Sequence, residues 1–136
     1  KGLVILPRVL MSNHVHAIVG SKSQERASDI WRDFKKYTSK KIIETIKTEI
    51  SESRSEWMLN RFEYSGKNDK KIKNYRFWQE GNDAQGIYLN DYFEQKLNYI
   101  HENPVKTELV NRAEDYRYSS AIDYAGGTGL LKVEVV

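Results

Sequence analysis

The order of hydrophobic and polar positions predicts a β-hairpin near the start of the chain. Residues 3–10 and 15–19 are two short runs rich in β-branched and aliphatic side chains, separated by Met11-Ser12-Asn13. Serine and asparagine favour tight turns, so we expect two antiparallel strands joined at this point. Because proline has no backbone N–H, we expect Pro7, inside the first run, to lie at a sheet edge or a β-bulge.

Three later segments have the spacing of amphipathic helices. The first runs from about Ile30 to Ile50. The second follows Ser53-Arg54-Ser55-Glu56, which has the S-x-x-E form of a capping box. The third runs from about Asn90 to Asn103, and we expect Pro104 to end it because a proline disfavours helical geometry in the residue before it.

The remaining segments carry weaker patterns. Residues 65–74 are polar and charged without periodicity, which indicates a connector, and residues 75–79 predict a short strand. A glycine pair at 126–127 precedes a short apolar tail that is compatible with a last strand. This order of elements predicts an α+β fold in which helices pack on an antiparallel β-sheet, and the length favours a single domain over residues 1–136.

The composition indicates which class of protein the chain belongs to. The chain has 39% hydrophobic and 30% charged residues, as globular proteins do, and no run approaches the roughly 20 apolar residues of a membrane span. It contains no cysteine, which fits a cytoplasmic protein and leaves only nitrogen and oxygen ligands for any metal. We therefore expect no membrane partner.

The net charge of +3 is mild, but lysines cluster along the sequence. One cluster consists of Lys35, Lys36, Lys40 and Lys41, and another of Lys67, Lys70, Lys71 and Lys73. Solvated surface and contact with phosphate groups both account for such clusters. Charge alone does not decide between them.

Two of the three histidines, His14 and His16, stand one residue apart at the start of the second strand-like run, on either side of Val15. Alternate side chains share a face of a strand, so the two imidazoles can bind one divalent cation. Two histidines in a polar pocket or at the surface would give the same pattern. The third, His101, falls outside the two side-chain stripes of the third helix described next, and we expect it at the surface.

The third predicted helix has two stripes of side chains. Phe93, Leu97 and Ile100 form an apolar stripe, and Tyr92, Lys96, Tyr99 and Asn103 form a second one roughly 100° away. Tyr99 and Asn103 are four residues apart and so lie close together. A tyrosine can act as a covalent nucleophile, although among nine tyrosines an ordinary half-buried aromatic residue is the more common reason for one at such a position.

Taken together, these motifs resemble a known family. The matching segments, in chain order, are "MSNHVHAIV" at 11–19, "SDIWRDFKKYTSKKI" at 28–42, "FWQEGN" at 77–82, "NYIHENPV" at 98–105 and "EDYRYSSAIDYAG" at 114–126. The chain is similar to the REP-associated tyrosine transposase-like group of single-tyrosine HUH transposases. The resemblance implies a ferredoxin/RRM-like HUH fold.

The resemblance also implies a reaction and a set of site residues. His14, His16 and Asn103 would bind Mg²⁺ or Mn²⁺, and Tyr99 would be the nucleophile. The expected activity is that of a transposase-type endonuclease and strand transferase. It cleaves single-stranded DNA, often next to a hairpin, to give a 5′-phosphotyrosine and a free 3′-hydroxyl. Candidate DNA contacts are Lys35, Lys36, Lys40, Lys41, Lys96 and Trp78.

Two departures from the family keep alternatives open. The sequence is expected to lack the family's first strand and helix, which would leave a sheet edge exposed, and Asp83-Ala84-Gln85-Gly86 differs from the usual residues after "FWQEGN". The alternative is a non-catalytic or domesticated module that binds single-stranded DNA. A cupin-like metal enzyme is disfavoured because no further histidine lies on a late strand. A monomer and a homodimer both remain possible.

Overall fold

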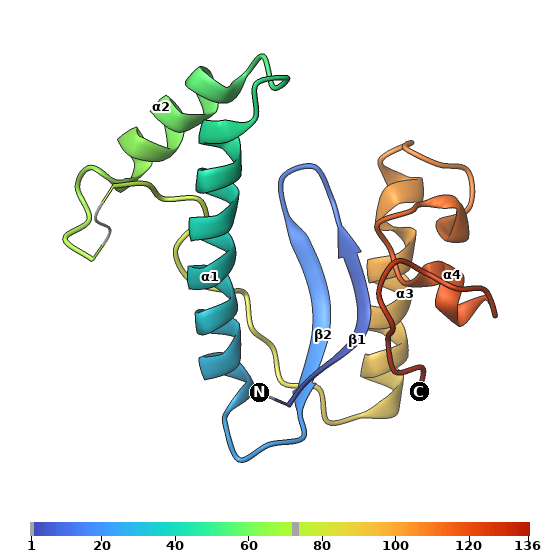
Figure 1. Cartoon of the computed structure of the whole chain (residues 1–136). Coiled ribbons are helices and arrows are strands. Elements are labelled where there is room, and N and C mark those ends of the chain that lie inside the picture. The colour runs from blue at the N-terminus through green and yellow to red at the C-terminus, as the bar shows by residue number, and fades with distance from the viewer. Residues whose placement is uncertain (1, 72–73) are drawn as a thin grey trace. The chain divides into compact units, whose positions relative to one another are not determined.

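The computed structural model describes residues 2–71 and 74–136 (Figure 1). The chain divides into two compact units, each described by itself. The hairpin unit comprises Lys1–Ala27 and Gln85–Val136, and the helical unit comprises Ser28–Ala84. The predicted α+β class is confirmed, because the described residues form a two-stranded antiparallel sheet together with helices.

The hairpin consists of β1 (Leu3–Leu10) and β2 (Val15–Ser21), as the sequence predicts. Its register shifts by one residue between the pairs Ile5↔Val19 and Arg8↔Ala17. Leu6 and Pro7 therefore both lie opposite Ile18, which is the two-against-one arrangement of a β-bulge. The bulge confirms the prediction for Pro7, whose missing N–H would interrupt a regular ladder.

The outer edge of β1 is covered by the C-terminal part of the same unit. The Leu10 N–H donates to the Tyr118 carbonyl at 2.9 Å, and the Ser120 N–H donates to the Arg8 carbonyl at 3.0 Å. Further along β1, the Glu134 N–H donates to the Ile5 carbonyl at 3.2 Å. The expected exposed edge is thus not found along β1, and the apolar tail contributes a hydrogen bond to the sheet without forming a strand.

Helix α3 (Asn90–Lys106) lies against the hairpin and closes the core of this unit. Val9, Met11 and Ile18 from the hairpin segment are buried together with Ile100 from α3. Residues paired across an antiparallel ladder share a face, so His16, which pairs with Val9, points to the side of the hairpin that α3 covers. The packing of α3 thereby brings its side chains next to the strand histidines.

The prediction that Pro104 ends this helix is wrong, because α3 continues to Lys106. A proline removes one hydrogen bond, the one its own N–H would make, and the next turn can still close. The Thr107 N–H donates to the Asn103 carbonyl at 3.1 Å, and the Leu109 N–H donates to the Pro104 carbonyl at 2.9 Å. The buried Pro104 ring contributes to packing in this last turn.

The expected surface position of His101 is also wrong, since only 7% of this residue is exposed. Its Nε2 lies 2.9 Å from Ser120 Oγ, and its ring contacts Tyr124 of α4 (Ala121–Tyr124) with 5.0 Å between centroids. The 3-10 turn Ala113–Asp115 and α4 form the C-terminal segment that packs beside α3. That segment covers a second face of α3, which the two-stripe analysis does not include.

The helical unit contains most of α1 (Ala27–Thr48) and all of α2 (Ser55–Gly66), close to the predicted ranges. The capping box before α2 is absent, because its N-cap residue Arg54 makes no side-chain cap hydrogen bond. The predicted strand at 75–79 is wrong. Instead Phe77 packs edge-on against Phe62 at 5.3 Å between centroids, so these aromatic residues fill the helical core.

The predicted connector at 65–74 is only partly described. Ser65 and Gly66 belong to the last turn of α2, while Lys67, Lys70 and Lys71 are exposed beyond it. Ile72 and Lys73 lie outside the described residues. Within the described part of the chain, no helix combines the length and the apolar composition that crossing a bilayer requires.

Ser120 is expected to stabilise the hairpin unit. Its buried Oγ accepts the Arg8 N–H at 2.9 Å and lies 3.2 Å from the Arg8 carbonyl. Ser120→Ala would leave that N–H without a side-chain partner, which costs roughly 1–3 kcal/mol. Urea unfolding should show this loss, whereas Ser53→Ala, at an exposed position, should change stability by less than about 0.5 kcal/mol. Equal effects of the two substitutions would contradict the assignment.

Stability should also fall on mild acidification because of His101. Desolvation by burial lowers the pKa of His101 below its ordinary value of 6.5, only partly offset by the nearby Asp123 charge. Below about pH 6.5 the unfolded chain takes up a proton that the folded chain resists, so the free energy of unfolding decreases. His101→Gln cannot titrate and should show a smaller decrease between about pH 7.5 and about pH 5.5. An unchanged pH dependence in this variant would exclude His101 as the cause.

Candidate functional site

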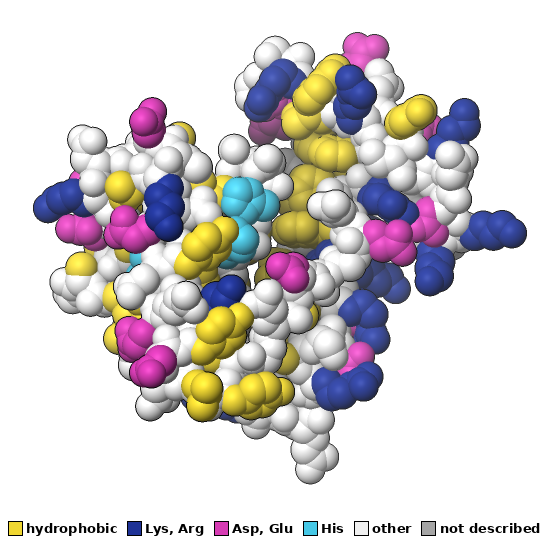
Figure 2. Space-filling view, turned by 180° about the vertical axis from the view of Figure 1, so that it is seen from behind, with side chains coloured by type: hydrophobic (Ala, Val, Ile, Leu, Met, Phe, Trp, Pro, Cys, Tyr) yellow, Lys and Arg dark blue, Asp and Glu magenta, His cyan; other side chains and the backbone are white. Residues whose placement is uncertain are grey.

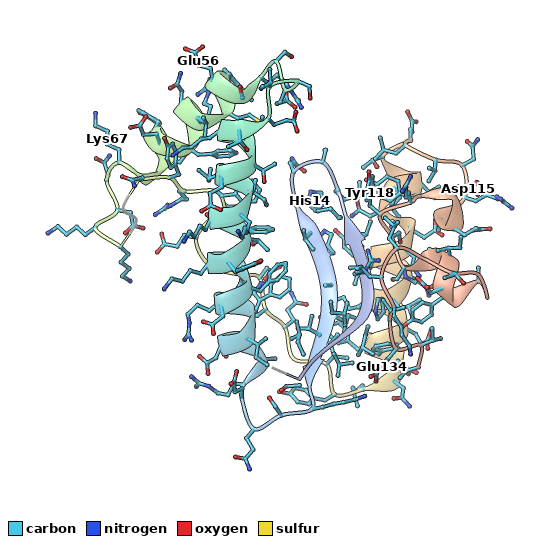
Figure 3. All side chains as sticks on the ribbon, viewed as in Figure 1. His14, Glu56, Lys67, Asp115, Tyr118 and Glu134 are labelled. Carbon is cyan, nitrogen blue, oxygen red and sulfur yellow. The ribbon has the colours of Figure 1, made fainter. Side chains whose placement is uncertain are left out.

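The two histidines lie together at the turn end of the hairpin. The Met11 N–H donates to the His14 carbonyl at 2.9 Å and closes the turn. The His14 and His16 ring centroids are 4.8 Å apart, with 74° between the ring planes. Their predicted placement on one face is confirmed, and Figure 3 labels His14 at this end of the hairpin.

Tyr99 of α3 joins this pair. Its ring lies edge-on to His16 with 5.3 Å between centroids. Tyr99 remains 44% exposed because it precedes the buried Ile100 and so lies about 100° from it around the helix, at the border of the packed interface. The structure therefore unites three of the predicted site residues from two elements at a position open to solvent. Histidine side chains are visible on the surface in Figure 2.

Asn13 orients the first imidazole. His14 Nδ1 lies 2.6 Å from Asn13 Oδ1. An amide oxygen only accepts hydrogen bonds, so Nδ1 carries the proton in this arrangement and the lone pair is on Nε2. Such support of a ligating histidine is a common feature of metal sites, and sequence reasoning used Asn13 only as a turn residue.

Two lysines flank the Tyr99 ring. Lys96 Nζ lies 5.9 Å and Lys106 Nζ lies 5.5 Å from the ring centroid. Lys96 also lies 5.2 Å from the centroid of Tyr92. Sequence reasoning missed Lys106 because it ended the helix at Asn103, although the seven-residue spacing from Tyr99 places Lys106 on the same face. Two ammonium groups make this position attractive to a phosphate.

Asn103 has a looser connection to the site. It lies half-buried on α3, one turn after Tyr99 and so roughly 6 Å further along the helix axis. Its carbonyl accepts the Thr107 hydroxyl at 3.0 Å. The ring contacts that unite His14, His16 and Tyr99 do not extend to Asn103, whose role as a ligand remains a prediction from the helix spacing.

The donor set is compatible with a divalent cation. Two adjacent imidazoles supply nitrogen ligands, and an amide oxygen from the neighbouring helix can complete part of the shell. Over residues 2–71 and 74–136 no group of three or more His, Cys, Asp or Glu side chains gathers. His14 and His16 would hold such a cation, and coordination positions beyond these two imidazoles could accept a substrate oxygen.

The candidate DNA contacts of the helical unit differ in their surroundings. Lys35 Nζ lies within 3.0–3.1 Å of three oxygens, from Gln79, Gly81 and Asn82, and thus holds the loop at 79–82. Trp78 Nε1 donates to Thr38 Oγ1 at 2.9 Å, and its ring contacts Phe34 and Phe77. Lys36, Lys40 and Lys41 are exposed, and Lys41 is 3.5 Å from Glu44. Only these three remain readily available to a ligand.

Loss of the Asn13 amide should weaken metal binding. In Asn13→Ala the His14 ring loses the partner that fixes its tautomer, and such substitutions typically cost ten- to a hundredfold in metal affinity. Titration of Mn²⁺ followed by electron paramagnetic resonance measures the affinity directly. Asn13→Asp keeps the accepting oxygen and should restore binding, and Ser12→Ala is the matched control in the same turn. Equal Mn²⁺ affinities of Asn13→Ala and wild type would contradict this role.

The chain has no match among protein-family models, curated proteins or solved structures.

Proposed function

We propose that the protein is a metal-dependent enzyme that nicks and joins single-stranded DNA, of the single-tyrosine HUH kind. The observation that carries the proposal is the contact of Tyr99 with His16, beside His14, at a solvent-open border of the core. A nucleophile next to paired imidazoles is the arrangement this chemistry needs. The proposal includes a REP-associated tyrosine transposase-like identity and an HUH version of the α+β fold.

The chemical step follows from the Tyr99 phenol. Its oxygen attacks the scissile phosphorus, the bond from phosphorus to the 3′ oxygen breaks, and a 5′-phosphotyrosine forms. The phenolic proton passes to solvent, and the leaving 3′ oxygen takes up a proton to become a hydroxyl. Attack by another 3′-hydroxyl reverses the step and joins a new strand. Lys96 and Lys106 would offset the phosphate charge beside the ring.

His14 and His16 would hold the metal, with Asn103 as a third ligand. A bound Mg²⁺ or Mn²⁺ polarises the phosphate and stabilises the leaving oxygen. Imidazole nitrogens suit Mn²⁺ better than the strongly oxygen-preferring Mg²⁺, so we expect stronger binding of Mn²⁺. Asn13 would keep the His14 Nε2 lone pair available for this ligand position.

The proposed substrate is a single strand with a neighbouring hairpin. Among the candidate DNA contacts of the helical unit, the exposed Lys36, Lys40 and Lys41 are best suited to contact its phosphates. A cytoplasmic location belongs to the same proposal, and both a monomer and a homodimer are compatible with it.

A covalent adduct tests the proposal. With Mn²⁺ and a hairpin-flanked single strand labelled at its 3′ end, wild type should give a labelled band on a denaturing gel, because the 3′ fragment stays attached to protein. Tyr99→Phe removes the nucleophilic oxygen and should abolish the band. Tyr92→Phe is the matched control on the same helix and should retain it.

The companion measurements separate catalysis from binding. A strand labelled at its 5′ end should shorten to a product with a free 3′-hydroxyl, and His16→Ala should greatly reduce adduct formation. Wild type that binds the strand without forming any adduct would reject the enzyme and favour the non-catalytic DNA-binding module.

A further inference from the structure

An aromatic stripe lies on the exposed side of α2. Trp57 is 59% and Tyr64 is 76% exposed, and Arg61 between them is also exposed. The three residues follow a spacing of four and then three, so they form one stripe along the helix. The Arg61 guanidinium lies 5.8 Å from the centroid of the Trp57 ring.

Packing of the helical unit does not account for this stripe. The buried side of α2 contains Phe62, which contacts Phe77, and the buried Gly66. At 100° per residue these positions lie roughly 140–180° around the helix from Trp57. The stripe therefore points away from the core. Packing within the helical unit does not explain why these two aromatic side chains are exposed to water.

The unit that contains the stripe has a net positive charge, although α2 itself carries Glu56 and Glu63 beside Arg61. Of the 22 Lys and Arg residues 13 fall in 28–84, against 10 of the 19 Asp and Glu, so the helical unit accounts for the whole net charge of +3. Lys67, Lys70 and Lys71 are exposed just beyond the helix end, and Figure 3 labels Glu56 and Lys67 at its two ends. Glu56 and Glu63 lie roughly 100–120° around the helix from Trp57.

We propose that the stripe of Trp57, Arg61 and Tyr64 binds the unpaired bases of single-stranded DNA. Aromatic rings at the surface of a unit with a net positive charge can serve as a platform for base stacking, and an arginine adds a cation–π partner. Trp57 and Tyr64 are about 10 Å apart along the helix axis at 1.5 Å per residue. That distance suits about three nucleotides at a 3.4 Å stacking separation.

This inference rests on the proposed function only in taking DNA as the ligand, and it concerns binding and not cleavage. The charge favours DNA over an apolar protein partner, since flanking lysines contribute nothing to purely apolar docking. A second copy of the chain at the stripe would be an alternative occupant. Binding measured without metal separates the stripe from the chemistry of Tyr99.

The experiment uses the full chain, EDTA and a fluorescein-labelled oligothymidylate, which forms no hairpin, with affinity read from anisotropy. Trp57→Ala and Tyr64→Ala should each weaken binding on the order of tenfold. Trp57→Phe retains a stacking ring and should bind nearly as wild type, while Trp57→Leu retains only apolarity and should bind as weakly as Trp57→Ala. Tyr88→Ala, at a 93% exposed tyrosine of the hairpin unit, is the control and should bind as wild type.

Several results would overturn the proposal. Wild-type affinity in Trp57→Leu would exclude stacking, and equal affinities of the Trp57→Ala/Tyr64→Ala double variant and Tyr88→Ala would exclude the stripe altogether. A double variant with unchanged DNA affinity but a lower sedimenting mass would make the stripe an interface between copies. If the stripe fails but the Tyr99 adduct forms, the proposed function stands. If oligothymidylate binding requires the stripe but no adduct forms, the proposed role of the stripe in binding stands and the proposed nuclease activity does not.

Discussion

The packing of Ile100 against Val9 and Ile18 is the constraint on which the candidate site depends. Ile100 fixes both the position and the rotation of α3 on the hairpin, and the preceding residue then has to lie about 100° around the helix, at the border of the interface. On the strand side, His16 is two residues before Ile18 and faces the same way. The contact between Tyr99 and His16 is thus a geometric consequence of burying Ile100 against Val9 and Ile18. A side chain at the edge of a packed core is held in position by its buried neighbour while one side of it stays open to solvent.

The residue after Ile100, His101, is buried, in contrast to the exposed Tyr99 before it. His101 is buried against Ser120, whose hydroxyl also meets the backbone of Arg8 in the middle of β1. Three consecutive residues of one helix turn therefore contribute the exposed Tyr99 ring, a core contact and a link to the covering C-terminal segment. Because that segment also protects the outer edge of β1, the two-stranded sheet needs no additional strand along this edge. The site and its support are formed within a single unit.

Sequence reasoning succeeded where the determining contacts are local. Alternation places His14 and His16 on one face, and the missing N–H of Pro7 favours a sheet edge or a bulge, whatever surrounds the hairpin. It failed where the structure is determined by contacts between segments that are distant in the sequence. His101 is buried by residues 19–23 positions further along the chain, and Tyr75 to Gln79, despite strand-like composition, have no strand to pair with. Lys106 was missed for a related reason, since the rule against helical geometry before proline is a preference that packing of Pro104 overrides. The position of the Asn103 side chain relative to the two histidines is likewise not determined by any local rule.

The two units differ in net charge. The hairpin unit carries 9 basic and 9 acidic residues, whereas the helical unit carries the entire excess of positive charge and the aromatic stripe. On the proposed function, attraction of a polyanion belongs to the helical unit, and the chemical step belongs to Tyr99 and the two lysines beside it. Association with a polyanion is strongly weakened by salt because it releases counterions. Salt should therefore act on the affinity for the strand, while the contact of Tyr99 with His16, fixed by apolar packing, is insensitive to it.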